Sequence, residues 1–190
     1  MKTKSPTNLG YALIGLIHLQ PQTGYDLRKV FETTPMGHYS SSPGAIYPAL
    51  KRLEKDGWIE GQVEGQQTLR PKRVYSTTER GVAMLRRWVS QPVAKDDIVW
   101  RDDELMLRFA FMGSLVDDTL TGRFLQQMIE GLDAYIDELE ELLGNMPQEG
   151  PLHGRLALAS GIDAYKARRS WARKAIRHFK PAAEESGRKS

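Results

Sequence analysis

A chain of 190 residues that is 40% apolar is long enough for one large domain or two small ones. It has no cysteine, which excludes disulfides, thiolate metal sites and cysteine nucleophiles and is compatible with a reducing compartment. The net charge of +3 is unevenly distributed, because residues 1–92 hold 13 Lys+Arg against 7 Asp+Glu and the remainder holds 14 against 17. This asymmetry favours a polyanionic partner for the first half.

The apolar N-terminal segment is not expected to be a signal peptide or a membrane helix. His18 and Gln20 interrupt it, and no small-residue cleavage site follows. No stretch approaches the roughly 18 apolar residues that a membrane span requires. We therefore expect a soluble, cytoplasmic protein.

The first half begins with three predicted helices. Apolar residues at helical spacing follow Thr7 and Asn8, and Pro21 ends this first helix. Thr23 is a candidate cap for a short second helix, "GYDLRKVFE". A third helix is expected after Ser41 or Ser42 and is expected to end at Gly57. One apolar face of this third helix is formed by Ile46, Leu50 and Leu53.

The period then changes from helical to alternating. "WIEGQVEG" and "RVYSTT" are predicted to pair as a β-hairpin, with "GQQTLRPK" as its flexible and then basic tip. "TTERGVAMLRRWVSQP" is a further helix that Thr77 or Thr78 could cap. Three helices, a hairpin with a basic tip and a helix are typical of a winged helix-turn-helix domain, here residues 1–92. A small α+β domain without a nucleic-acid role is the alternative.

The second half, residues 93–181, is predicted to be α-helical, with residues 182–190 as a disordered tail. "DDELMLRFAFM" is apolar on every side, and two long helices follow, the second at about residues 152–179. Apolar residues on these helices alternate spacings of three and four, as in a heptad seam. We expect a dimerisation arm, with an intramolecular three-helix bundle as the alternative. Its predicted contact residues are Leu125, Met128, Leu132, Tyr135, Leu139, Leu158, Ile162 and Ile176.

Three segments together resemble the PadR family of transcriptional regulators: "TGYDLRKVFE", "SPGAIYPALKRLEKDGWIE" and "RPKRVYSTTERG". The similarity covers about residues 9–90, and "GAIYPALKRL" is its most specific part. The helical remainder, with "DDELMLRFAFMG", is similar to the long-tailed branch that includes the virulence activators. The resemblance implies a homodimer joined through its C-terminal helices. It also implies a repressor that releases DNA when it binds an effector such as a phenolic acid or a hydrophobic drug.

Pro48 is an unexpected residue inside the third helix, because an interior proline removes a backbone N–H donor. If Ile46, Leu50 and Leu53 face the core, Pro48 lies near the solvent side, and the helix is expected to start irregularly and to become regular after Pro48. We expect this start to hold Tyr47 against DNA. Side chains of the helix and the hairpin tip suit contacts with phosphates and base edges. The candidate DNA-binding residues are Ser41, Ser42, Gly44, Tyr47, Pro48, Lys51, Arg52, Arg70, Lys72 and Arg73.

No enzyme, cofactor or metal site is expected. The four histidines are scattered without ligand spacing, and no phosphate loop or nucleophile elbow occurs. "DDE" at 102–104 is better explained as a helix start than as a metal cluster. Aromatic residues leave open either ordinary core packing or an effector cavity between domains or across the dimer. The candidate effector residues are His18, Trp88, Trp100, Tyr165 and Trp171.

The patterns and the resemblance to the PadR family together lead us to expect a homodimeric repressor on a palindromic operator, with double-stranded DNA as its partner and no membrane association. Effector binding would change the spacing of the two recognition helices, which a palindrome sets. Two alternatives are a winged-helix protein–protein interaction module without specific DNA binding, and a DNA binder without an effector. A basic stripe on the last helix, Lys166 to Lys180, is expected to pair with "DELEE" at 137–141 rather than with flanking DNA.

Overall fold

The computed structural model describes residues 5–39, 43–64, 71–147 and 150–179. Its contacts divide the chain into two compact units, Met1–Val89 and Ser90–Ser190, which we call the winged unit and the helical unit. Ser41, Ser42 and Arg70 lie outside the described residues, as do Lys180 and the predicted tail. Within the described ranges, no helix combines the length and apolarity needed to cross a bilayer.

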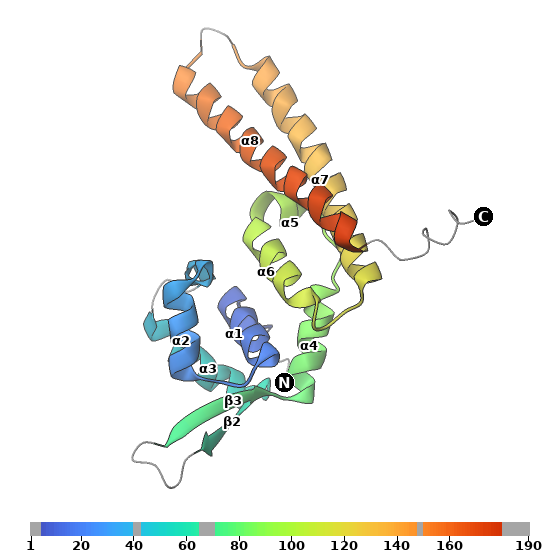
Figure 1. Ribbon diagram of the computed structural model, residues 1–190. Helices are drawn as coiled ribbons and strands as arrows, with labels where there is room; N and C mark the ends of the chain where they lie inside the picture. Colours follow the sequence, from blue (N-terminus) through green and yellow to red (C-terminus); the bar gives the residue numbers. More distant parts are fainter. Residues whose placement is uncertain (1–4, 40–42, 65–70, 148–149, 180–190) are drawn as a thin grey trace, which may run out of the picture. The chain divides into compact units, whose positions relative to one another are not determined.

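The winged unit has the predicted order of three helices, a hairpin and a helix (Figure 1). The elements are α1 (Asn8–Leu19), α2 (Gly24–Thr33), α3 (Ile46–Lys55), β2 (Ile59–Glu64), β3 (Lys72–Thr77) and α4 (Glu79–Val89). Two 3₁₀ turns, Pro35–Tyr39 and Pro43–Ala45, join α2 to α3. The winged helix-turn-helix prediction is confirmed.

A two-residue strand, β1 (Gln22–Thr23), was not predicted from the sequence. It pairs antiparallel with β3, with Gln22 opposite Tyr75, so that β3 is the central strand of the order β1-β3-β2. Two residues are too few to show alternation, which is why pattern analysis misses the strand. The pairing ties the start of α2 to the hairpin.

Caps and a left-handed glycine set the ends of these helices as expected. Thr23 accepts a hydrogen bond from the Asp26 amide, and Asp26 accepts one in return from the Thr23 amide, which completes a capping box. The Thr78 hydroxyl accepts from the Gly81 amide at the start of α4. Gly57, with φ of 74°, follows the end of α3, where a side chain would be strained.

The core of the winged unit comes from one face of each helix. Leu13, Ile14, Leu27, Ile46 and Leu50 are fully buried. Burial of such side chains stabilises a fold by about 1.5–3 kcal/mol each. This packing holds α3 against α1 and α2 by its apolar face and leaves its other face in solvent.

The helical unit contains α5 (Lys95–Trp100), α6 (Asp102–Met112), α7 (Asp118–Asn145) and α8 (Leu152–Ala175), followed by a 3₁₀ turn at Ile176–Phe179. Figure 1 shows α7 and α8 side by side along most of their length. The sequence pattern did not separate α5 from α6. The break falls at Arg101, whose backbone (φ −136°, ψ 32°) leaves the helical region before Asp102 starts the next helix.

Several predicted dimer residues are already buried within one chain. Leu125, Met128, Leu132 and Ile162 are at most 3% exposed in the helical unit. Their heptad spacing reflects intramolecular packing, which was the alternative explanation of the pattern. Tyr135, Leu139, Leu158 and Ile176 are only half-buried, and the role of the predicted residues in dimerisation stays a prediction.

Candidate nucleic-acid interface

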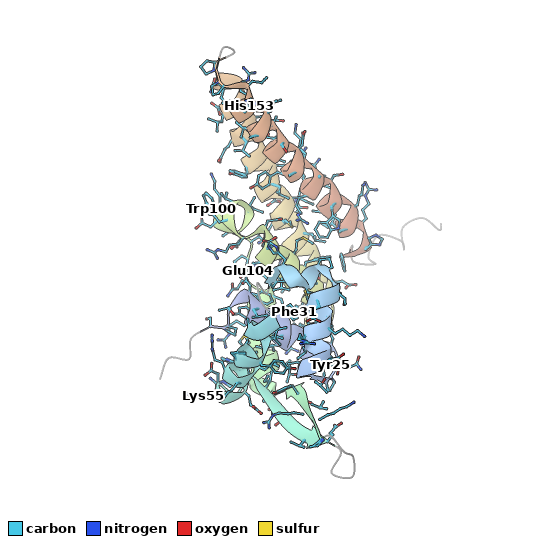
Figure 2. The ribbon with its side chains drawn as sticks, turned by 90° about the vertical axis from the view of Figure 1, so that its left-hand side faces the viewer. Tyr25, Phe31, Lys55, Trp100, Glu104 and His153 are labelled. Atoms are coloured by element: carbon cyan, nitrogen blue, oxygen red, sulfur yellow. The ribbon has the colours of Figure 1, made fainter. Side chains whose placement is uncertain are left out.

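The outward face of α3 is polar and basic, while its inward face is apolar. Ile46, Leu50 and Leu53 are at most 4% exposed. Tyr47 is 51% exposed. The exposed face also carries Pro48, Lys51, Arg52 and Lys55. Figure 2 shows Lys55 at the outer surface of this helix. The helix therefore presents a phenol and basic side chains to solvent.

The structure explains why Pro48 is tolerated in α3. The α-helix begins at Ile46, after the 3₁₀ turn Pro43–Ala45, so Pro48 is its third residue. Amides of the first turn have no intrahelical acceptor, and a proline there removes no α-helical hydrogen bond. Gly44 lies exposed in the preceding turn. The predicted irregular start is confirmed, with the regular helix beginning two residues before Pro48 rather than after it.

A pocket of about 360 Å³ lies beside this face, where the starts of α2, α3 and β3 meet. Asp26, Tyr47 and Lys72 line it together with Thr23, Gly24, Tyr25, Arg73 and Tyr75. Figure 2 shows Tyr25 at the end of α2 nearest the strands. The pocket combines phenol groups with two cationic side chains, which are the groups that contact phosphate oxygens in nucleic-acid complexes.

Gly24 is what allows Tyr47 to close one side of this pocket. A Cβ at position 24 would lie 2.8 Å from Cε1 of Tyr47, closer than carbon atoms approach without displacement. Tyr25, 60% exposed, follows directly on α2. Gly24 therefore leaves room for the ring of Tyr47, and the neighbouring Tyr25 exposes its own ring to solvent.

Arg73 is bound to a carboxylate on α3. Its Nη2 atom donates to Oε1 of Glu54 at 2.5 Å, and the guanidinium lies 5.9 Å from the centre of the Tyr75 ring. The hydrogen bond and the charge of Glu54 raise the pKa of Arg73. Burial raises the pKa of the Tyr75 phenol. The positive charge of Arg73 is therefore already paired with the carboxylate of Glu54. Lys72, by contrast, lies exposed at the start of β3.

Thr23, Tyr25 and Tyr75 line the pocket but are absent from the DNA-binding residues predicted from the sequence. A signal for Tyr25 was present, since Leu27 and Phe31 place the opposite side of α2 in the core. An exposed tyrosine at a helix start, next to a glycine, was thus detectable. Tyr75 gave no such signal, because only the sheet pairing brings it beside α3.

The five candidate effector residues are divided between the units. In the winged unit, His18 is half-buried, and Trp88 stacks on Tyr11 with ring centres 4.1 Å apart. In the helical unit, Trp100 is 80% exposed, and Figure 2 shows where its side chain lies on this unit. Tyr165 packs on Tyr135 and Trp171 on Phe109, with centroid distances of 5.0 and 5.1 Å. Aromatic packing within their own units explains the positions of Trp88, Tyr165 and Trp171. A role of the five residues in effector binding stays a prediction.

The basic stripe of α8 is engaged in ion pairs with its own unit. Lys166 meets Glu140 at 2.6 Å, within the predicted acidic segment. Arg169 and Arg173 both reach Asp133 instead, at 2.6 and 2.9 Å. Burial tends to raise the pKa of Asp133, but hydrogen bonds from the two arginines outweigh it and lower that pKa.

Metal-ligating side chains do not cluster in threes anywhere in the part of the chain that the structure describes. In the "DDE" segment, Asp102 pairs with Arg168 at 2.6 Å. The three acids occupy the first turn of α6, where negative charge favours the helix dipole.

The chain is similar to known transcriptional regulators. Residues 13–87 match the model of the transcriptional regulator PadR-like family. The negative transcriptional regulator PadR of Bacillus subtilis is 29% identical over 120 residues, which are 63% of this chain and 65% of that protein. The probable transcriptional regulator Rv1176c of Mycobacterium tuberculosis is 25% identical over 86% of this chain and 93% of its own length. Among solved structures, Bacillus subtilis PadR in complex with operator DNA aligns with a TM-score of 0.42 and 24% identity, over 90% of this chain and 99% of that one.

Proposed function

We propose that this chain, which belongs to the PadR-like family of transcriptional regulators, represses transcription by binding a palindromic operator as a homodimer. The observation that carries the proposal is the joint surface of the α3 outward face and the adjacent pocket of Tyr25, Tyr47 and Lys72. The role is not enzymatic, and it is exercised in the cytoplasm, where the operator lies.

In this mechanism α3 enters the major groove, which accommodates an α-helix. Lys51 and Arg52 reach phosphates or guanine edges from the exposed side of the helix. Lys72, Tyr25 and Tyr47, which line the pocket, hold a phosphate of the flanking backbone. Ser41, Ser42 and Arg70 lie outside the described residues and stay candidates from the sequence alone. Specificity then comes from α3, and the hairpin contributes affinity that is independent of sequence.

Dimerisation places two such helices on the two halves of a palindrome. The helical unit supplies candidate contacts near the turn between α7 and α8, where apolar side chains are exposed. Leu142, Leu152 and Leu156 are 54%, 63% and 58% exposed. A second copy of the same unit would cover them, since exposed leucines grouped in this way are typical of interfaces. Sedimentation velocity of Leu142→Ser/Leu156→Ser should give monomers where the wild type gives dimers.

Release by a small hydrophobic or phenolic effector is part of the proposal. Tryptophan fluorescence reports on it, because Trp88, Trp100 and Trp171 are spread over both units. Titration with phenolic acids and cationic dyes should change the emission and lower operator affinity. A flat response to every compound would leave a DNA binder without an effector.

The test of the function is fluorescence anisotropy on a labelled duplex from upstream of the chain's own gene, against a random duplex, at two salt concentrations. Tight binding that survives competitor supports a regulator. Weak and equally salt-sensitive binding to both duplexes would leave only an electrostatic surface. Absence of binding at low salt would overturn the DNA role and favour the protein–protein interaction module.

A further inference from the structure

Glu54 occupies an unusual place for an acidic residue, on a helix proposed to face a polyanion. Its side chain is 29% exposed, and one oxygen, Oε1, serves two donors. The amide of Gly61 on β2 donates to it at 3.0 Å, and Nη2 of Arg73 on β3 donates at 2.5 Å. A single carboxylate of α3 thus binds both strands of the hairpin.

Gly61 makes this arrangement possible. It lies opposite Tyr75 in the ladder, while Arg73 is paired with Val63, so the Arg73 side chain runs diagonally over position 61 to reach α3. A Cβ on Gly61 would lie 2.5 Å from Nε of Arg73, 2.9 Å from Oε1 of Glu54 and 3.0 Å from Cε1 of Tyr75. Any side chain at this position must push the guanidinium away from the carboxylate.

Two of the residues around Gly61 also line the pocket beside Tyr47. Arg73 and Tyr75 line it, and Lys72 precedes Arg73 on the strand. A shift of β3 relative to α3 would therefore move Lys72 away from Tyr47 and change the spacing between the hairpin and the groove-facing helix. Charge-assisted hydrogen bonds with fixed geometry are suited to holding such a spacing.

We propose that Glu54 is a positioning residue for DNA recognition: it clamps Arg73 and the Gly61 amide and thereby sets the hairpin at the distance from α3 that the operator requires. This inference rests on the proposed function, since it assigns the alignment of that same surface. It also assigns Arg73 to the clamp, where the sequence had suggested a direct DNA contact.

The direction in which Glu54→Gln changes the affinity for operator DNA distinguishes a positioning role from a purely electrostatic one. The variant removes a negative charge near the DNA surface, so electrostatics alone predicts equal or tighter binding to all DNA. The clamp predicts that operator affinity falls about tenfold, the loss expected for one charged hydrogen bond, while binding to random DNA does not weaken. The matched control is Glu60→Gln, an exposed carboxylate that precedes Gly61 on β2 and points to the other face. This control should leave the ratio of operator to random affinity unchanged.

Gly61→Ala tests the clamp without a change of charge. It should lower the operator affinity by a similar factor, measured well below its melting temperature. Wild-type operator affinity in both Glu54→Gln and Gly61→Ala would overturn the proposal. So would an equal loss in Glu60→Gln.

Amide hydrogen exchange of Gly61, measured without DNA, separates this inference from the proposed function. The amide should be protected in the wild type and should exchange about tenfold faster in Glu54→Ala. Equal exchange in both proteins would overturn the clamp itself. Failure of the wild type to bind any DNA would overturn the proposed function, and the positioning role with it, even if the exchange result shows that the clamp exists.

Discussion

Replacing Lys72 with Ala should weaken DNA binding evenly across sequences and make it less sensitive to salt. Lys72 lies exposed at the start of β3 and lines the pocket with Tyr25 and Tyr47, where it suits a phosphate rather than a base edge. Each phosphate that a protein neutralises contributes about −0.9 to the slope of log affinity against log salt. A homodimer loses two such contacts, so the slope should become shallower by about 1.8.

This change of slope converts into a measurable difference in affinity. Between about 50 and 200 mM salt, wild-type affinity should fall about twelvefold more than that of Lys72→Ala. Fluorescence anisotropy on operator and random duplexes at four or more salt concentrations provides the slopes. The matched control is Lys95→Ala, which removes the same charge from a lysine paired with Glu138 at 2.6 Å in the helical unit. Its slope should match that of the wild type.

Two results would refute the assignment of Lys72. An unchanged slope would mean that Lys72 does not neutralise a phosphate. A loss confined to the operator duplex, with random DNA bound as before, would mean that Lys72 reads bases, because phosphate contacts carry no sequence information.

Three further predictions concern stability. Gly81→Ala should destabilise the winged unit by about 2–3 kcal/mol in urea unfolding, because the new Cβ would lie 2.1 Å from the Trp58 carbonyl oxygen. The control Gly144→Ala on α7, with no other atoms within 4 Å of its Cβ, should be neutral or stabilising by up to about 1 kcal/mol. Equal effects of the two substitutions on the free energy of unfolding would contradict the close contact of Gly81 with Trp58. Because the pKa of Asp133 is lower in the folded than in the unfolded chain, its ionised carboxylate stabilises the fold at neutral pH, by under about 1 kcal/mol for so exposed a group. This stabilisation should be lost as the pH falls below about 4. Asp133→Asn should therefore flatten that part of the stability–pH curve. Asp97→Ala should lower the free energy of unfolding of the helical unit by about 3 kcal/mol, because it removes the carboxylate that faces the 2%-exposed Arg108. Arg108→Met should lower it by less, since no buried charge is then left behind. A larger loss for Arg108→Met than for Asp97→Ala in thermal unfolding would refute this account.

Local signals predicted much of the winged unit. Thr23, Thr78 and Gly57 mark helix ends through interactions within a few residues of each, so the printed sequence reveals them. The apolar faces of α2 and α3 follow from helical periodicity alone. Pro43 and Pro48 together indicated an irregular helix start, although the position at which the regular helix begins was visible only in the backbone.

The helical unit shows the limit of periodicity. A heptad pattern reports that a face is buried, and it does not report against what. The spacing of Leu125, Met128 and Leu132 is the same whether the partner is α8 of the same chain or another copy, and only the packed structure assigns these residues to the core of one unit. The break between α5 and α6 at Arg101 was likewise hidden, because both segments are compatible with one continuous helix.

The sequence by itself thus determined the order of the helices and the hairpin in the winged unit, the helix caps and the basic character of the proposed DNA-binding surface, because each depends on neighbours along the chain. Tertiary structure alone decided which of those basic residues are available. Arg70, Lys72 and Arg73 look alike in the sequence, yet Arg73 is bound by Glu54, 19 positions earlier, and Lys72 faces the pocket with Tyr25 and Tyr47. The pairing of β3 with β1 and β2 and the packing of the sheet on α3 create these neighbours, and no local pattern encodes contacts between residues so far apart in the chain.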